Sequence, residues 1–126
     1  MFVPKDLFYS DTHEWVMFLE NGLARMGLTD FAQQSLGDIV YINLCMAGDV
    51  IKTGDSLGDV ESIKAVSEII SPTDGVVTQV NEAALEKPEL VNQDPYGAWL
   101  IEIESVTDKS TLINANDYEA LIASHK

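Results

Sequence analysis

Closely spaced turn signals between residues 37 and 75 constrain the fold of this chain more than any other feature. The dipeptide Gly-Asp occurs at 37–38, 48–49, 54–55 and 58–59, and SPTDG follows at 71–75. Glycine and aspartate interrupt regular structure because they favour the backbone conformations of turns. The segments between these turns are too short for long helices, so the pattern predicts short strands in a compact antiparallel β-architecture.

Patterns within and around this segment predict particular strands. Residues 12–28 are typical of a hairpin, because THEWVMFLE and LARMGLT flank Asn-Gly, a strong signal for a two-residue turn. DIVYINL alternates and predicts a strand with Val40, Ile42 and Leu44 on one face. AWLIEIES, which begins at residue 98, alternates in the same way.

Two segments predict short helices. TDFAQQSLG has Thr29 to cap its start and Gly37 to end it. Near the C-terminus, Asn116 and Glu119 resemble a capping box at the start of an amphipathic stretch. The segment 82–97 contains prolines and is expected to be mostly irregular. The predicted class is therefore mostly β, with short inserted and C-terminal helices.

The length of 126 residues fits a single domain, residues 1–126, that is large enough to hold a core. A single cysteine, Cys45, excludes an intramolecular disulfide and suits a reducing compartment. No apolar run approaches the roughly 20 residues that span a bilayer. The N-terminal stretch MFVPKDLFYSDTHEW shows neither the apolar region of a signal peptide nor an Arg- and Ser-rich transit pattern. We expect a cytoplasmic protein, although a mature mitochondrial form stays open.

The charge of the chain indicates what it does not bind. Seven Lys and Arg residues stand against 21 Asp and Glu, which gives a formal net charge of −14. Nucleic acids and anionic membranes are bound by clustered basic residues, and here the basic residues are isolated. The composition therefore predicts no nucleic-acid or membrane partner. It favours either basic protein partners or simple solubility.

Catalytic and metal-binding motifs are absent. The sequence has no P-loop, no dinucleotide-binding glycine fingerprint and no cysteine pair for a metal. The two histidines are His13 and His125, and a Cys45–His13 nucleophile pair would require the two residues to be close in space. Cys45 ends an apolar strand, which is more typical of a buried inert thiol. We expect no catalytic residue and no metal.

Lys64 is the residue most indicative of chemistry. It lies in VESIKAVSEII, which predicts two short strands joined by a tight turn near Ile63 and Lys64. A lysine at such a tip projects outward on a flexible four-carbon stem. An enzyme that acylates the ε-amine needs a rigid and accessible presentation, which a tight β-turn provides. The alternative is an ordinary solvated charge.

A family resemblance covers nearly the whole chain. ESIKA at 61–65 resembles the lipoylation site of the glycine cleavage H-protein family, whose motif is close to ESVKA. Further stretches resemble other motifs of the family in the same order: YSDTHEWV (9–16), GLTDFAQQSLGDIVYINL (27–44), SPTDGVVTQVN (71–81) and PELVNQDPYGAWL (88–100).

The resemblance implies a lipoyl-domain-like barrel-sandwich hybrid of two small antiparallel sheets. Lipoate would be attached as an amide to Lys64, within a recognition motif formed by Glu61, Ile63 and Ala65. The family is a non-catalytic carrier, because cofactors and partner enzymes perform the chemistry. A lipoate-attaching enzyme would modify Lys64. We expect a monomer, which is the natural default for a shuttle, and a bacterial source for the cytoplasmic protein.

The resemblance also implies the partners. The arm would accept an aminomethyl group from glycine at a pyridoxal-phosphate glycine decarboxylase. It would pass the group to a tetrahydrofolate-dependent aminomethyltransferase and be reoxidised by dihydrolipoyl dehydrogenase. The loaded arm can fold back onto the carrier in this family, and the matching positions here are Thr12, Glu14 and Glu68. A carboxylate among them could pair with the cationic amine.

Other lipoyl-like carriers remain as alternatives. Biotinyl carriers share the fold, but methionines usually flank their lysine, whereas Ile63 and Ala65 flank Lys64. The lipoyl domains of 2-oxoacid dehydrogenases normally belong to long chains with linkers and an acyltransferase domain. A role as a relay that donates lipoate to other complexes stays open.

Overall fold

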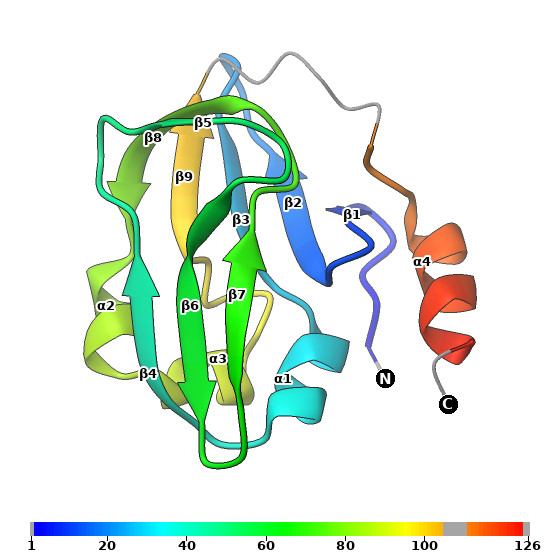
Figure 1. The fold of residues 1–126 in the computed structure, drawn as a ribbon. Helices are drawn as coiled ribbons and strands as arrows, with labels where there is room; N and C mark the ends of the chain where they lie inside the picture. Colours follow the sequence, from blue (N-terminus) through cyan, green and yellow to red (C-terminus); the bar gives the residue numbers. More distant parts are fainter. Residues whose placement is uncertain (1, 105–110, 125–126) are drawn as a thin grey trace.

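Two antiparallel sheets face each other, with short helices beside them (Figure 1). The computed structural model describes residues 2–104 and 111–124. The strands are β1 (Phe8–Tyr9), β2 (Glu14–Phe18), β3 (Ala24–Leu28), β4 (Ile39–Leu44), β5 (Val50–Ile51), β6 (Ser56–Ser62), β7 (Val66–Ile70), β8 (Gly75–Val80) and β9 (Ile101–Glu104). The helices are α1 (Asp30–Leu36), α2 (Glu82–Glu86), α3 (Glu89–Gln93) and α4 (Ala115–Ala123).

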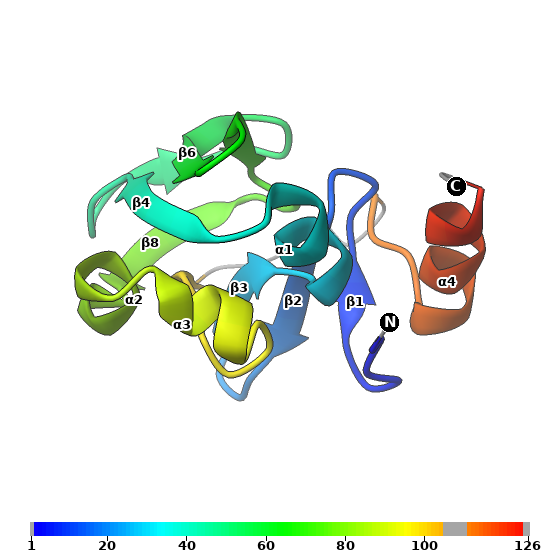
Figure 2. The same cartoon turned by 90° about the horizontal axis from the view of Figure 1, so that it is seen from below.

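The larger sheet has the strand order β1-β2-β3-β9-β8-β5, and the smaller has the order β4-β6-β7. Neighbouring strands are antiparallel throughout. Figure 2 shows the smaller sheet lying over the larger one. The mostly β, two-sheet fold predicted from the sequence is confirmed. No helix within the described ranges is long and apolar enough to cross a bilayer.

Two apolar clusters hold the elements together. The main core lies between the sheets and includes Val16, Met26 and Val60, none of them more than 1% exposed. A second cluster attaches α4 to β1, where the rings of Tyr9 and Tyr118 stack with centroids 4.6 Å apart. Each fully buried apolar side chain contributes roughly 1.5–3 kcal/mol to the stability of the fold. The second cluster contains several such side chains, so it holds α4 against β1 separately from the main core.

The predicted β2–β3 hairpin and first helix are confirmed. Asn21 and Gly22 both have positive φ, of 61° and 74°, as a type I′ turn requires. The Thr29 hydroxyl accepts a hydrogen bond from the amide of Ala32 at 3.2 Å and caps α1. Gly37 ends this helix with a φ of 77°, in the left-handed region that favours glycine.

The predicted face of β4 is wrong at Val40. A bulge in the pairing of β4 with β6, between Ile39 and Tyr41, adds a residue to the strand. Ile39 and Ile42 consequently face the core, while Val40 is 56% exposed. Simple alternation cannot detect this shift, because a bulge moves the remaining residues to the opposite face.

Two further predictions of local structure are wrong. The segment 82–97 is not mostly irregular, because it contains α2 and α3. Pro88 directly precedes α3 with a φ of −57°, which suits the start of a helix. Asn114, not Asn116, caps α4, and its side chain accepts from the amide of Asp117 at 2.8 Å. Ile113, the residue before Asn114, forms a β-bridge with Tyr9, and this bridge fixes where the helix begins.

Candidate functional site

Lys64 lies at the tip of the β6–β7 hairpin, as the sequence predicted (Figure 1). The amide of Ser62 donates to the carbonyl of Ala65 at 2.8 Å and closes the turn. The Ser62 hydroxyl accepts from the amides of Lys64 at 3.3 Å and Ala65 at 3.1 Å. These bonds fix the backbone of the tip, while the Lys64 side chain stays exposed. The sequence analysis missed Ser62, although a serine that begins a turn is a known local signal.

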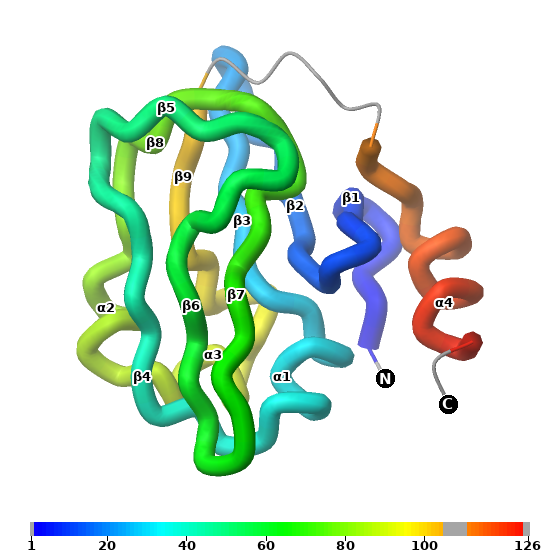
Figure 3. The backbone as a smooth tube through the Cα atoms, in the orientation of Figure 1, coloured from blue at the N-terminus to red at the C-terminus, as the bar shows by residue number. Residues whose placement is uncertain are grey.

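The tip is also attached to the connection between α1 and β4, beside which it lies in Figure 3. The amide of Ile63 donates to the carbonyl of Asp38 at 3.0 Å. A β-carbon at Gly37 would lie 3.3 Å from Cε of Lys64. The lysine stem therefore passes close over this glycine, where a side chain would press against it. Gly37 thus serves both the end of α1 and the path of the lysine.

Asn92 on α3 supports this connection from the other side. Its carbonyl oxygen accepts from the amide of Ile39 at 2.9 Å. Its amide group donates to the carbonyl of Gly37 at 2.8 Å and to Gln33 at 3.0 Å. Asn92 was missed because its segment was expected to be irregular. Only the tertiary structure brings it to the residues that hold the tip.

The residues of the predicted recognition motif surround Lys64. Glu61 pairs with Val66 across the hairpin, and it lies on the outer face because neighbouring Val60 is buried. Ile63 is 72% exposed, which is unusual for so large an apolar side chain. An approaching enzyme would meet the lysine, an apolar side chain and a carboxylate together.

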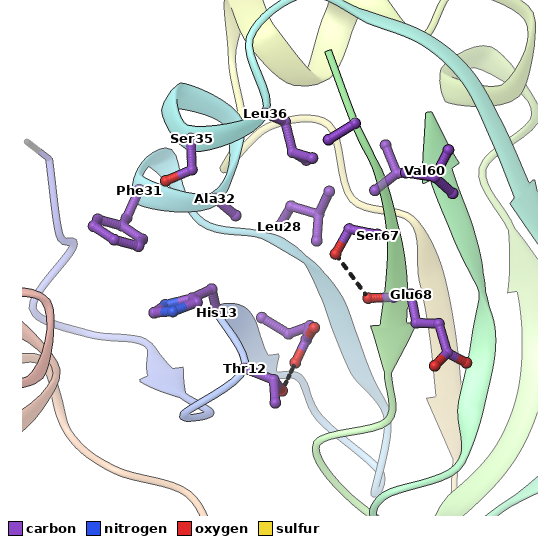
Figure 4. Close-up of a pocket in the computed structure, with 13 residues that line it drawn as sticks. Thr12, His13, Leu28, Phe31, Ala32, Ser35, Leu36, Val60, Ser67 and Glu68 are labelled. Carbon is purple, nitrogen blue, oxygen red and sulfur yellow. Dashed lines mark hydrogen bonds between the residues drawn. The ribbon is translucent and has the colours of Figure 1, made fainter. Parts of the chain in front are cut away.

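A cleft of about 340 Å³ opens beside this hairpin, between α1, the start of β2 and β7 (Figure 4). Its apolar wall consists of Leu28, Phe31, Ala32, Leu36, Val60, Ala65 and Val66. Its polar lining consists of Thr12, His13, Glu14, Ser35, Ser67 and Glu68. Because Ala65 belongs to the turn, the cleft begins next to Lys64. The three residues expected to contact a folded-back arm, Thr12, Glu14 and Glu68, all line it.

Glu14 is a buried carboxyl group in this cleft, with 1% of its surface exposed. Its Oε1 accepts hydrogen bonds from the hydroxyls of Ser10, at 2.7 Å, and Thr12. Its Oε2 accepts from the amide of Ile70 at 3.4 Å. Burial raises the pKa of Glu14 to about 7, against the lowering effect of these hydrogen bonds, and nearby Asp11 adds to the rise. The site thus offers an incoming cation a carboxyl group that titrates near neutral pH.

Glu68 lines the cleft differently. In the β6–β7 register, Ser67 is opposite buried Val60, and Glu68 is opposite Asp59. Ser67 therefore points to the same side of the sheet as Val60 and lines the cleft, and Figure 4 shows the Glu68 carboxylate pointing away from the cleft. The role of Glu68 toward the arm stays a prediction. Its carboxylate, unlike that of Glu14, does not point into the cleft.

His13 links the cleft to α4. It has a φ of 73°, uncommon for a residue other than glycine, and its Nδ1 lies 2.9 Å from the hydroxyl of Tyr118. That hydroxyl also lies 2.7 Å from Oγ1 of Thr29. His13 and Cys45 line different cavities, and burial raises the pKa of the Cys45 thiol, which opposes formation of a thiolate. The structure thus gives no support to a nucleophile pair.

Residue His125 lies outside the described residues. Within residues 2–104 and 111–124, no three His, Cys, Asp or Glu side chains gather to form a metal site. An exposed lysine on an anchored hairpin tip, next to a cleft with a buried carboxyl group, is the arrangement expected of a carrier of the lipoyl-domain-like class.

Comparisons with known proteins identify the family within this class. The family model for glycine cleavage H-proteins matches residues 7–125. A glycine cleavage system H protein of Carboxydothermus hydrogenoformans is 49% identical over 123 residues, 95% of this chain and 94% of the relative. One from Lachnoclostridium phytofermentans is 45% identical over 122 residues, 97% of this chain and 96% of the relative.

A solved structure indicates the same family. The crystal structure of a glycine cleavage system H protein from Mycobacterium marinum superimposes with a TM-score of 0.88 at 34% identity, covering 96% of this chain and 99% of that one. This chain belongs to the glycine cleavage H-protein family, the lipoyl carriers of the glycine cleavage system. Members carry lipoate covalently on a lysine and are carriers, not catalysts.

Proposed function

We propose that Lys64 is the lysine that carries lipoate, and that residues 1–126 act as one carrier domain. The observation that carries this assignment is the anchored turn, which holds the backbone of Lys64 and leaves its amine exposed beside the cleft. The lipoate-attaching enzyme would read Glu61, Ile63 and Ala65 around the lysine. All three lie on or beside the hairpin tip.

The cleft fits the arm that such a lysine would carry. It begins at Ala65, its walls are largely apolar, and Gly37 leaves room for the lysine stem. When attached, the lipoyl group supplies a disulfide that accepts the aminomethyl group derived from glycine. The carrier's own residues would then bind and shield the loaded end. Apolar wall residues would exclude water, and the Glu14 carboxylate would pair with the amine.

The proposed partners are glycine decarboxylase, aminomethyltransferase and dihydrolipoyl dehydrogenase. The net charge of −14 supports encounter with basic surfaces on these enzymes, at rates that fall with added salt. Each partner must release the carrier after one step, so we expect weak contacts and a monomer in solution. We also propose a cytoplasmic location.

Mass spectrometry tests the attachment site. The unmodified protein is incubated with a lipoate–protein ligase, ATP and lipoate, and the modified peptide is mapped. We expect one lipoyl increment, on Lys64 alone. Lys64→Arg should fold normally but gain no increment and show no carrier activity, because arginine keeps the charge and cannot form the amide. Lys52→Arg, in another exposed turn, is the matched control. An increment on the Lys64→Arg variant would refute the assignment.

A second experiment tests the shielding of the loaded arm. Glu14→Gln should leave lipoylation intact but shorten the lifetime of the aminomethyl-loaded form. Glu68→Gln should have the smaller effect, because the Glu68 carboxylate points away from the cleft (Figure 4). Equal lifetimes for the wild type and Glu14→Gln would count against a role for Glu14. They would leave the assignment of Lys64 untouched.

A further inference from the structure

The hydroxyl group of Ser10 connects the backbone of Glu14 to the carboxyl group of the same residue. The Glu14 amide donates to Oγ of Ser10 at 3.0 Å, and this hydroxyl donates to Oε1 of Glu14 at 2.7 Å. Ser10 is 6% exposed, so water does not readily replace it. The closed ring of bonds fixes the direction of the carboxyl group relative to its own strand.

Counting protons shows how the two carboxyl oxygens differ. A hydroxyl has a single proton to donate, and both Ser10 and Thr12 donate theirs to Oε1 of Glu14. The two hydroxyl oxygens lie 3.2 Å apart, but neither hydroxyl then has a proton left to donate to the other. Oε2 receives only the long bond from the amide of Ile70, at 3.4 Å. Within the described part of the chain, Oε2 is the oxygen with remaining capacity to accept.

Glu14 belongs to neither of the two salt bridges found among the described residues, which are Lys5–Glu119 and Arg25–Glu102. Asp11 in the preceding turn is acidic, and Tyr118 on α4 contributes a hydroxyl that His13 contacts through Nδ1. On β7, Glu68 points its carboxylate away. A cation that enters the cleft would be the partner this carboxylate lacks.

We propose that Ser10 is a positioning residue that reserves Oε2 of Glu14 for a primary ammonium group at the end of the arm. The inference rests on the proposed function, in which the loaded arm enters this cleft. Because Oε1 is committed to two hydroxyl donors, a proton on the carboxyl group must also reside on Oε2. The proton and the ammonium group therefore compete for one oxygen, and the arm is released when that oxygen is protonated.

The competition gives the cleft a defined pH dependence. The ammonium group is held by the ionised carboxylate, so retention increases as pH rises through the pKa of Glu14, about 7, and is lost below it. The hydrogen bond from Ser10 lowers this pKa. Ser10→Ala should therefore move the midpoint to higher pH.

The first test uses the protein without a lipoyl group. The Glu14 carboxyl carbon is followed by NMR across the pH range in the wild type, Ser10→Ala and Ser10→Thr. We expect Ser10→Ala to raise the midpoint by about one to two pH units, and Ser10→Thr to restore most of it by returning a hydroxyl. Ser35→Ala, also in the cleft, is the control for a general effect of losing a hydroxyl. An unchanged midpoint in folded Ser10→Ala would overturn the inference.

The second test uses lipoylated, aminomethyl-loaded protein without partner enzymes. The lifetime of the loaded form is measured as a function of pH for the wild type and for Glu14→Gln. The wild-type lifetime is divided by the variant lifetime at each pH, because this ratio removes the intrinsic pH dependence of the aminomethyl group. We expect this ratio to rise with the same midpoint as the Glu14 titration in the wild type. The coincidence of midpoints tests the inference even if Ser10→Ala fails to fold. A ratio independent of pH would overturn it, whereas loss of Lys64 lipoylation would be the distinct failure of the proposed function.

Discussion

Replacing Glu14 by glutamine should stabilise the unlipoylated protein, and increasingly so at higher pH. Burial raises the pKa of Glu14 from 4.5 to about 7, so the folded state favours the protonated carboxyl group. The associated stability is fully present below the unfolded-state pKa and is lost as pH rises through the folded-state value. Glutamine cannot ionise, has nearly the same shape, and can still accept from the hydroxyls of Ser10 and Thr12.

The magnitude follows from the two pKa values. A difference of about 2.5 units corresponds to about 3 kcal/mol of free energy of unfolding. Relative to the wild type, Glu14→Gln should therefore gain about 3 kcal/mol between about pH 4.5 and pH 8. For a chain of 126 residues this is a relative rise of about 10 °C in melting temperature.

Urea unfolding across this pH range, followed by circular dichroism, measures the effect. The variant and the wild type are compared by the difference in their free energies of unfolding at each pH, because the contributions of other titrating groups cancel in this difference. Glu20→Gln, in the exposed β2–β3 turn, is the control, and its difference should be small and flat. A flat difference for Glu14→Gln as well would refute the argument that burial of this carboxyl group destabilises its ionised form.

Two other substitutions test the parts of the fold that position the hairpin. Gly58→Ala should destabilise the protein by about 3 kcal/mol or more in urea unfolding, because its β-carbon would lie 1.8 Å from the carbonyl oxygen of Asn43, and a wild-type midpoint would contradict this. Asn92→Ala should cost about 2 kcal/mol in thermal unfolding, because the amide of Ile39 and the carbonyl of Gly37 lose their partner. Asn92→Asp should recover part of this by keeping the acceptor for Ile39.

Local chemistry made part of the structure predictable from sequence. Asn21 and Gly22 define a turn by themselves, since both tolerate positive φ. Thr29 marks the start of α1 and Gly37 marks its end, because each forms a hydrogen bond with a backbone group within one helical turn of its own position. The tip at Lys64 was predictable for the same reason, because a tight turn joins two short strand segments on either side of it.

Features that depend on distant contacts could not be predicted. The bulge that exposes Val40 comes from pairing with β6, and the start of α4 at Asn114 comes from a bridge to β1. The sequence indicated Glu14 and Glu68 as equivalent candidates for the arm. The structure separates them, because Glu14 on β2 is buried in the cleft, whereas Glu68 on β7 lies opposite Asp59 and its carboxylate points away from the cleft (Figure 4). The positioning role inferred for Ser10 also required knowing which carboxyl oxygen it contacts.

The bond between Ile63 and Asp38 has a consequence for how strongly the cleft needs to bind. If Lys64 carries lipoate as proposed, this bond would fix the root of the arm to the α1–β4 connection beside the cleft, and only the arm itself would search for the pocket. A short flexible tether of this kind produces a local concentration in the millimolar range. An intrinsic dissociation constant of similar size would then leave the pocket filled about half of the time. The loaded end could be sheltered between encounters and still leave on the timescale of a diffusing enzyme's visit.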